Sequence, residues 1–309
     1  MNEIVLSVLI PVFNWNISDL LDKLIKEIIS NKLDNVEIVI LDDMSSDLNL
    51  KKINRKNVDF FIQKYPHLKL IYKELLSNIG RAAVRNLLIK ESNGLYLLFL
   101  DCDILPDSNI FLQKYINFCR NRKYDVVCGG LSYKQIPVSK SEYKFYLFLS
   151  NMTDVKPAVI RNTAPWRYVL TSNVAVNRCV LEKEVFGDFK GYGYEDVEWA
   201  IRIHRQFKII HIDNQVTHLG LVQRSKVYER MVTSIDNYFI LSKLHPMEFE
   251  ESRIFKYILL FQLINIPMLK LLKLLLEKLF FLNLGDNFSY VVFQLQKAVL
   301  FTIKLKKDN

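Results

Sequence analysis

Two acidic residues stand two positions apart at the end of a strongly apolar stretch. Residues 95–103, LYLLFLDCD, run from six apolar or aromatic side chains directly into Asp101, Cys102 and Asp103. Two carboxylates this close repel each other and shift their pKa values unless a positive charge offsets them. Residues 95–107 contain no Lys or Arg. We therefore expect a divalent metal ion beside Asp101 and Asp103, positioned to hold a bound ligand.

Polar and aromatic residues also follow three other apolar stretches. The first stretch ends in PVFNWN (residues 11–16), the second in DDMSSD (42–47), and the third leads to NIGRAAVRN (78–86). Phe13 could stack on a base, Asp43 could accept a hydrogen bond from a ring N–H, and the two acids of DCD could hold a metal on a diphosphate. Together the four segments suit a nucleotide. Each one alone also fits turn formation, helix capping or packing.

The elements that must position these segments alternate along the first half of the chain. Ser18 and the segment PDSN (106–109) are expected to begin two of the helices. Alternation of helices with continuously apolar strands predicts a mostly parallel sheet covered on both faces, with ligands beyond the carboxyl ends of the strands. The sequence predicts strands over 4–10, 36–41, 68–72, 95–100 and 124–131, and helices near 18–31, 81–92 and 107–121.

Several nucleotide- and phosphate-binding classes do not fit these segments. A dinucleotide-binding protein needs G-x-G-x-x-G after its first strand, and IPVFNWN contains no glycine; a P-loop needs G-K-[ST], which the chain lacks. A haloacid-type phosphatase stays open as an alternative because it uses Asp-x-Asp after a strand with magnesium. Its pattern continues with Thr or Val two residues later, where this chain has Leu105, and it lies on the first strand of that fold.

The segments LSVLIPVFN, EIVILDDMSSD, NIGRAAVRN and YLLFLDCD together resemble the family-two glycosyltransferases of the GT-A fold. This resemblance covers about residues 4–245. It implies a site for a nucleotide-sugar, commonly a UDP-sugar, and a divalent cation, Mn²⁺ or Mg²⁺. It implies Asp101 and Asp103 as the metal-binding Asp-x-Asp pair. The nucleotide-binding residues that it implies are Pro11, Phe13, Asn14, Asp43, Asn78, Arg81 and Asp101.

A second segment, FKGYGYEDVEWAIR (189–202), is similar to the G-Y-G-x-E-D segment of bacterial members of that family. Its two glycines allow the backbone to approach a ligand closely. The resemblance implies that Asp196 is the base that removes the acceptor proton during a single inverting displacement, with Glu195 orienting the acceptor. Acids in the first turn of a helix are also common as partners of the helix dipole.

Four further residues are candidates by the same resemblance. His218, in VTHLG, would complete the metal shell, since manganese accepts mixed carboxylate and imidazole ligands. A polar residue at the end of a strand is the alternative reading of His218. Trp166, Asn173 and Gly193 are candidates for contact with the donor or acceptor sugar, and Trp166 could equally be a packing residue.

Composition narrows the cellular setting. The chain has 309 residues, a formal charge of +9 and four cysteines without C-x-x-C spacing, so we expect neither a zinc site nor disulfides, and a cytoplasmic location. The N-terminal stretch carries Glu3 and breaks at Pro11, which is unlike a signal peptide.

The last part of the chain, residues 246–309, differs in character. From Ser252 onward nine Lys or Arg face three Asp or Glu, and MLKLLKLLLEKLFFL (268–282) predicts a helix with a broad leucine face and a basic stripe. The longest uncharged run, 257–269, has 13 residues, whereas a spanning helix needs ~20. We expect an interfacial helix at the inner face of the cytoplasmic membrane, or alternatively a helical subdomain or dimer face. Without a nucleic-acid motif, we expect no nucleic acid as partner.

The sequence therefore predicts an α/β protein with a GT-A nucleotide-binding fold over 1–245 and a basic amphipathic helical extension over 246–309. The expected activity is metal-dependent transfer of a sugar from a nucleotide-sugar to a hydroxyl of a glycan or lipid-linked glycan, in bacterial surface polysaccharide synthesis. The alternatives are the haloacid-type phosphatase and a relative that binds nucleotide-sugar or glycan without turnover.

Overall fold

The computed structural model describes residues 3–136, 141–187, 189–282 and 284–308, and the chain forms two compact units. Unit 1 comprises Met1–Pro137, Asp154–Asp188 and Trp199–Gly220, and unit 2 comprises Val138–Thr153, Phe189–Glu198 and Leu221–Asn309. The second unit therefore begins earlier in the chain than the expected boundary at residue 245. The division falls within one helix, after Glu198.

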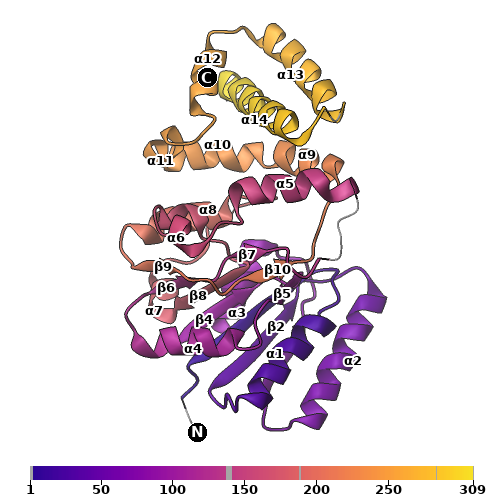
Figure 1. Ribbon diagram of the computed structural model, residues 1–309, viewed down its shortest axis with the longest axis vertical. Coiled ribbons are helices and arrows are strands. Elements are labelled where there is room, and N and C mark those ends of the chain that lie inside the picture. Colours follow the sequence, from indigo (N-terminus) through magenta and orange to yellow (C-terminus); the bar gives the residue numbers. More distant parts are fainter. Residues whose placement is uncertain (1–2, 137–140, 188, 283, 309) are drawn as a thin grey trace. The chain divides into compact units, whose positions relative to one another are not determined.

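Alternating strands and helices in unit 1 build a mostly parallel sheet, as the sequence predicts (Figure 1). Within the described residues, seven strands lie in the order β3-β2-β1-β4-β8-β6-β9. All neighbouring pairs are parallel except those that β8 makes with β4 and β6. The strands are β1 (Leu6–Val12), β2 (Val36–Asp42), β3 (Lys69–Glu74), β4 (Tyr96–Leu100), β6 (Val126–Cys128), β8 (Asn173–Asn177) and β9 (Ile209–His211).

A smaller sheet joins parts of unit 1 that are far apart in sequence. β10 (Val216–His218) pairs antiparallel with β5 (Ile104–Pro106) and parallel with β7 (Leu131–Ser132). In this register His218 lies opposite Ile104, the residue after Asp103. The predicted strand over 124–131 is thus two strands, β6 and β7. They are separated by Gly129 and by Gly130, whose φ of +86° suits a turn.

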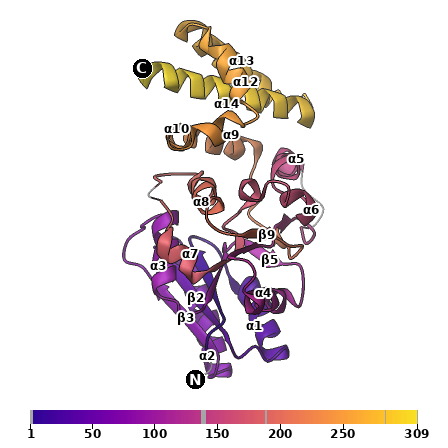
Figure 2. The same cartoon turned by 90° about the vertical axis from the view of Figure 1, so that its left-hand side faces the viewer.

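Side chains of the large sheet alternate between two apolar layers. Leu6, Val8 and Ile10 of β1 point into one cluster, and Leu9 points into the other, as the two-residue period of a strand requires. Helices α1 (Ser18–Ser30) and α4 (Phe111–Asn121) cover the first face, and α3 (Arg81–Lys90) and α7 (Arg178–Lys183) cover the second (Figure 2).

The starts of two helices differ from the prediction. Ser18 is the first residue of α1 rather than its cap, and its N–H donates to the Asn16 side chain over 2.9 Å. The segment 106–109 does not open α4, because residues 104–106 form β5 and α4 begins at Phe111. The remaining helices of unit 1 are α2 (Leu48–Lys64), α6 (Ala158–Arg161) and the 3-10 turn η2 (Pro165–Tyr168), and α8 (Glu195–His204) is shared by both units.

Unit 2 is helical in its described residues. Its last helix contacts the others along much of its length, and aromatic rings such as Phe145, Phe280 and Phe301 fill the space between them. Among the described residues, we find no helix with the length and apolar character needed to span a bilayer. Besides its part of α8, unit 2 contains η1 (Ser141–Tyr143), α5 (Lys144–Thr153), α9 (Arg224–Thr233), α10 (Ile235–Leu244), α11 (Pro246–Glu250), α12 (Phe255–Gln262), α13 (Ile266–Phe281) and α14 (Asp286–Asp308).

Candidate functional site

The β5–β10 pairing brings Asp103 and His218 together. Asp103 Oδ2 lies 3.4 Å from His218 Nε2, and the N–H of Leu219 donates to the Asp103 main-chain oxygen over 2.7 Å. Gly220 leaves the space between them open, because a Cβ there would overlap Asp103 Oδ2 and come within 3.1 Å of His218 Cε1. Burial would raise the pKa of Asp103, but the hydrogen bond and charge of His218, together with Arg81, hold it below the usual value. Asp103 is thus kept ionised.

Asp101 has a basic partner that its own segment does not supply. Arg85, a buried residue of α3, donates from Nη2 to Asp101 Oδ1 over 2.9 Å. The expectation that the acids of DCD lack a neutralising side chain is therefore wrong. The positive charge beside Asp101 is the Arg85 guanidinium, which comes from helix α3 on one face of the sheet rather than from the segment itself. Only a metal facing Asp101 from another direction could bind it while this ion pair persists.

Asp43 holds the loop that follows β3. Its two carboxylate oxygens accept the N–H groups of Ile79 (2.7 Å) and Gly80 (3.0 Å), and Asn78 donates its side-chain amide to the Asp43 main-chain oxygen (2.9 Å). Gly80 has a φ of +86° and precedes α3, so Arg81 becomes the first residue of that helix. The loop thus fixes Arg81 close enough for its charge to act on Asp103.

The loop after β1 leaves an aromatic ring exposed. Phe13 follows β1 and is 51% exposed, which is high for so large an apolar side chain. Asn14 adopts a left-handed φ of 49° and is held by Ser45 and Asp47: its N–H donates to Ser45 Oγ (2.8 Å), and its Oδ1 accepts the Asp47 N–H (3.0 Å). Pro11 lies within β1, opposite Leu41 of β2. Phe13 therefore lies at the C-terminal end of β1, in a loop that hydrogen bonds hold in place.

The donor set of Asp103 and His218 fits Mn²⁺ or Mg²⁺. Carboxylate oxygen and imidazole nitrogen are both ligands of manganese, and a two-residue site leaves positions for phosphate oxygens and water. In the described part of the chain, no group of three or more His, Cys, Asp or Glu side chains could hold a metal without such additional ligands. A metal here would therefore be bound jointly by protein and substrate.

The segment around Glu195 and Asp196 belongs to unit 2. Gly191, Gly193 and Tyr194 all have positive φ values, 82°, 87° and 74°, and form the turn that leads into α8. Asn237 of α10 donates to the Gly193 main-chain oxygen over 2.9 Å, and the Tyr194 ring stacks on Tyr238 at 4.9 Å between centroids. This turn is thus fixed by helices of its own unit.

The two acids occupy the first turn of α8. Glu195 is buried, whereas Asp196 is partly exposed and its Oδ1 accepts the N–H of Val197 over 2.9 Å. Acidic side chains in the first turn of a helix interact favourably with the positive end of the helix dipole. Asp196 is thus the more accessible of the two carboxylates to a ligand.

Two sugar-contact candidates differ in their surroundings. Trp166 is partly buried in η2 and packs against the second apolar cluster, with the Arg167 guanidinium 5.1 Å from its ring centroid. Asn173 is 1% exposed; its amide donates to the main-chain oxygens of Gly130 and Asn214, and its Oδ1 accepts the Tyr115 hydroxyl. Asn173 therefore holds strand ends together, and its contact with a sugar stays a prediction.

The structure also contains a buried pair, Arg161 and His211, that the sequence analysis does not predict. Arg161 Nη1 donates to His211 Nδ1 over 2.7 Å, and His211 Nε2 lies 2.9 Å from the Pro165 main-chain oxygen. Arg161 also donates to the main-chain oxygens of Gly129 and Ile212. The burial of His211, chiefly, lowers its pKa to about 4. Its position on the apolar strand KIIHI is the one sequence signal that marks it as buried.

Glycosyltransferases of two bacteria are similar in sequence to this chain. The chain is 25% identical over 267 residues to a poly(ribitol-phosphate) beta-glucosyltransferase of Bacillus spizizenii, which covers 83% of the chain and 39% of that relative. It is 31% identical over 118 residues to an uncharacterized glycosyltransferase of Haemophilus influenzae, covering 38% and 43%. The chain thus spans less than half the length of either relative.

Two solved structures share the fold over nearly the whole chain. A mannosyltransferase of Pyrobaculum calidifontis, solved with GDP-Man and Mn²⁺, matches with a TM-score of 0.62 at 14% identity, covering 99% of this chain and 87% of that one. TarS of S. aureus, solved with UDP-GlcNAc, matches with a TM-score of 0.52 at 18% identity, covering 98% and 92%. The GT-A-type α/β fold with a C-terminal helical region is therefore confirmed.

A sequence profile assigns the chain to a family. The profile described as Glycosyl transferase family 2 matches residues 7–165, a little over half of the chain. These residues include Asp43, Arg81, Asp101 and Asp103. The chain belongs to glycosyl transferase family 2.

Proposed function

We propose that the chain is an inverting glycosyltransferase that moves a sugar from a nucleotide-sugar, with a UDP-sugar as our first choice, to an acceptor hydroxyl. The observation that carries the proposal is the pairing of Asp103 with His218 at 3.4 Å, in a space that only glycine at position 220 leaves open. This pair stands at the end of the segment that carries the Asp-x-Asp pattern. Family membership supports glycosyl transfer and replaces the phosphatase alternative.

The donor side would be read by the loops after β1, β2 and β3. Phe13 offers an exposed ring on which a base can stack. Each Asp43 oxygen already accepts one backbone N–H, but a carboxylate has about four acceptor positions in all, so it can still accept from a base. Of the two similar structures, the mannosyltransferase was solved with GDP-Man and TarS with UDP-GlcNAc, which supports a nucleotide-sugar as donor class.

Asp103 and His218 would hold the divalent cation, Mn²⁺ or Mg²⁺. When bound, such a cation acts as a Lewis acid that stabilises the leaving diphosphate. Arg81 adds positive charge on the same side, as its effect on the pKa of Asp103 indicates. Asp101, paired to Arg85, would support the nucleotide and the loop rather than supply the main metal contact.

The acceptor side would be served by the segment similar to G-Y-G-x-E-D. We assign Asp196 as the base, because it is partly exposed and lies at a helix N-terminus, and Glu195 as the residue that orients the acceptor. The proton of the acceptor hydroxyl would pass to Asp196 as the oxygen attacks the anomeric carbon and the bond to the nucleotide diphosphate breaks. The acceptor class is a glycan or lipid-linked glycan of a bacterial surface polysaccharide. The four cysteines are free, which supports a reducing, cytoplasmic location.

A thermal-shift screen of nucleotide-sugars in the presence of manganese tests this proposal. A donor at a hundred times its dissociation constant should add ~2.7 kcal/mol to the free energy of unfolding. The same donor should add little to an Asp103→Asn variant. Failure of every UDP- and GDP-sugar to stabilise the wild-type chain would contradict the proposed donor class.

A further inference from the structure

Helices α12 and α13 expose a broad apolar face. On α13, Leu269, Leu276 and Phe280 are buried, yet other apolar side chains of the same helix face outward. The exposed fractions reach 85% for Leu263 and 69% for Leu271. An apolar surface of this kind commonly marks a site of interaction. The exposed leucines that matter below are Leu259, Leu260, Leu263, Leu271, Leu274 and Leu275.

The same helices carry an excess of positive charge. Helices α12 and α13 together carry four Lys, namely Lys256, Lys270, Lys273 and Lys278, against one acid, Glu277. Lys270 and Lys278 are exposed on α13 among the leucines. A second copy of this face would bring like charges together, whereas an anionic surface would be complementary to it.

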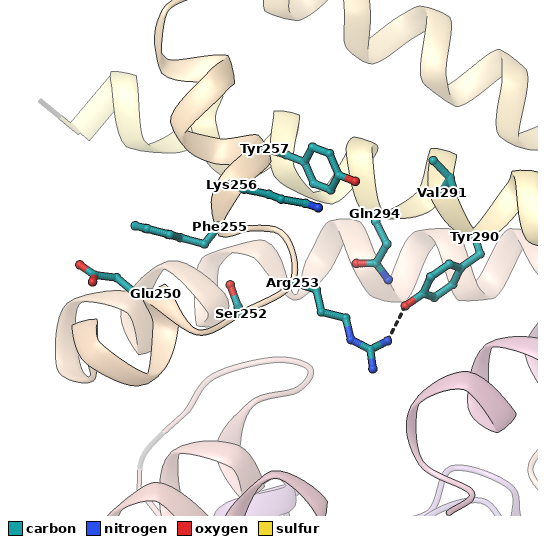
Figure 3. Close-up of a pocket in the computed structure, with 9 residues that line it drawn as sticks. All are labelled: Glu250, Ser252, Arg253, Phe255, Lys256, Tyr257, Tyr290, Val291 and Gln294. Carbon is teal, nitrogen blue, oxygen red and sulfur yellow. Dashed lines mark hydrogen bonds between the residues drawn. The ribbon is translucent and has the colours of Figure 1, made fainter. Parts of the chain in front are cut away.

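A pocket of about 480 Å³ lies where α12 begins and α14 passes beside it (Figure 3). Arg253 donates to the Tyr290 hydroxyl over 3.0 Å. Figure 3 shows the polar ends of Lys256 and Gln294 turned toward this space, while Glu250 points away. Among the described residues, neither Arg253 nor Lys256 forms an ion pair with a carboxylate. Guanidinium, ammonium and amide donors of this kind suit a phosphate group.

The pocket and the apolar face meet on α12. Lys256, Leu259, Leu260 and Leu263 are spaced at i, i+3, i+4 and i+7, which sets them on one side of the helix. Ile258 and Phe261 lie on the other side and are buried. A cation that lines the pocket is thus followed by exposed leucines along a single helical face, as the recognition of an amphiphile with an anionic head requires.

We propose that unit 2 binds the surface of an anionic phospholipid membrane, with a headgroup phosphate in the pocket of Arg253 and Lys256 and the leucines of α12 and α13 at the acyl boundary. Within the described ranges, no helix is long and apolar enough to span the bilayer. This inference goes beyond the proposed glycosyl transfer and does not depend on it.

Vesicle flotation of the full chain tests the proposal. The chain should float with vesicles of phosphatidylcholine mixed with phosphatidylglycerol and much less with phosphatidylcholine alone. Raising the salt concentration should release part of the bound chain, since salt screens the charges and leaves the apolar contact intact. Equal binding to both kinds of vesicle, or to neither, would overturn the proposal.

Paired variants separate the two parts of the surface. Arg253→Gln with Lys256→Gln should lower partition onto anionic vesicles by about tenfold or more. The matched control removes two exposed charges from α2 of unit 1, Lys52→Gln with Lys56→Gln, and should leave partition unchanged. Wild-type binding by the Arg253/Lys256 variant would overturn the headgroup site.

A second double variant, with a matched control, tests the exposed leucines. Leu260→Ser with Leu263→Ser should weaken binding at low and at high salt. The control is Ile53→Ser with Ile62→Ser on α2, whose side chains are 44% and 41% exposed. All four positions are exposed, so the fold should persist; if the double variant unfolds by circular dichroism, Leu263→Ser alone replaces it. Sedimentation could instead show that the wild-type chain is a dimer and the leucine variant a monomer, with neither protein binding vesicles. In that case the face is an interface between copies and the proposal is wrong.

Discussion

Asp101 and Asp103 face different partners, and this separates their roles. Asp101 is paired with the buried Arg85 at 2.9 Å, whereas Asp103 faces His218 at 3.4 Å beside Gly220. Two acids of one short motif can therefore be distinguished by experiment. One should respond chiefly in stability and the other chiefly in metal binding.

The first prediction concerns Asp103. UDP should bind more tightly with Mn²⁺ than with EDTA, and Asp103→Asn should remove that difference, because the variant loses the carboxylate that faces His218. Isothermal calorimetry of UDP under both conditions measures it. Asp34→Asn, at an exposed turn before β2, should behave as wild type. Equal UDP affinities with manganese and with EDTA in the wild-type chain would count against a metal at this site.

The second prediction concerns Asp101. Asp101→Asn should lower the free energy of unfolding by about 1–3 kcal/mol, because it removes the carboxylate that faces the buried Arg85 guanidinium. Urea unfolding without ligand measures it, again with Asp34→Asn as the control. Adding Arg85→Met should recover part of the loss. A variant as stable as wild type would mean that the ion pair contributes nothing.

The third prediction concerns the base. Asp196→Asn should keep UDP affinity within a few-fold while turnover falls by ~10²-fold or more, the usual scale for losing a general base. Glu195→Gln should lose less turnover, or lose it through the acceptor KM. Steady-state kinetics with the two variants side by side measure this. A near-normal Asp196→Asn with an inactive Glu195→Gln would reverse the assignment, and two active variants would falsify the catalytic reading of the segment.

At the scale of elements, strands were easier to predict than the contacts between them. The apolar stretches over 36–41 and 95–100 match β2 and β4 to within one residue, because buried parallel strands are continuously apolar. Helix α2 was missed, because it buries just Asn54, Val58 and Phe61 and so shows a weak period.

The contacts that build the site join segments distant in sequence. Arg85 reaches Asp101 from a neighbouring helix, and β10 carries His218 to Asp103 across more than a hundred residues. No local pattern encodes such pairings, because they depend on strand register. His218 was singled out only through the family resemblance. The hydrogen bonds of Asn173 to Gly130, Asn214 and Tyr115 also arise from strand order, so its local sequence does not reveal them.

The fourth prediction concerns β9. The fold depresses the pKa of His211 from 6.5 to about 4, so it stays neutral there while the unfolded chain gains a proton. Its contribution to stability is therefore complete above pH 6.5 and is lost as the pH falls toward about 4. Urea unfolding at several pH values in that window should show less acid sensitivity for His211→Gln than for wild type. His67→Gln, at an exposed histidine, is the control, and identical pH profiles for all three proteins would contradict the prediction.

At the scale of the whole molecule, the chain passes repeatedly between two compact units. Unit 1 contains Asp43, Arg81, Asp103 and His218, and unit 2 contains Glu195, Asp196 and the helices from α9 onward. The expected division into residues 1–245 and 246–309 has the chain cross from the first unit to the second only once. Sequence could not reveal the others, because residues 138–153 and 189–198 carry no linker-like composition. Truncation at residue 188 would therefore delete β9 and β10 from unit 1, so binding experiments require the full chain.

Gly220 gives the proposed metal pair an unusual genetic vulnerability. Any replacement adds at least one carbon, and that carbon would collide with Asp103 Oδ2 and crowd the His218 ring. An allele altered only at codon 220 would thus encode an enzyme in which Asp103 and His218 are unchanged in sequence but displaced in the structure. Screens that judge a gene functional because its Asp-x-Asp motif is preserved would count such an allele as intact, although its Asp103 and His218 side chains are disturbed.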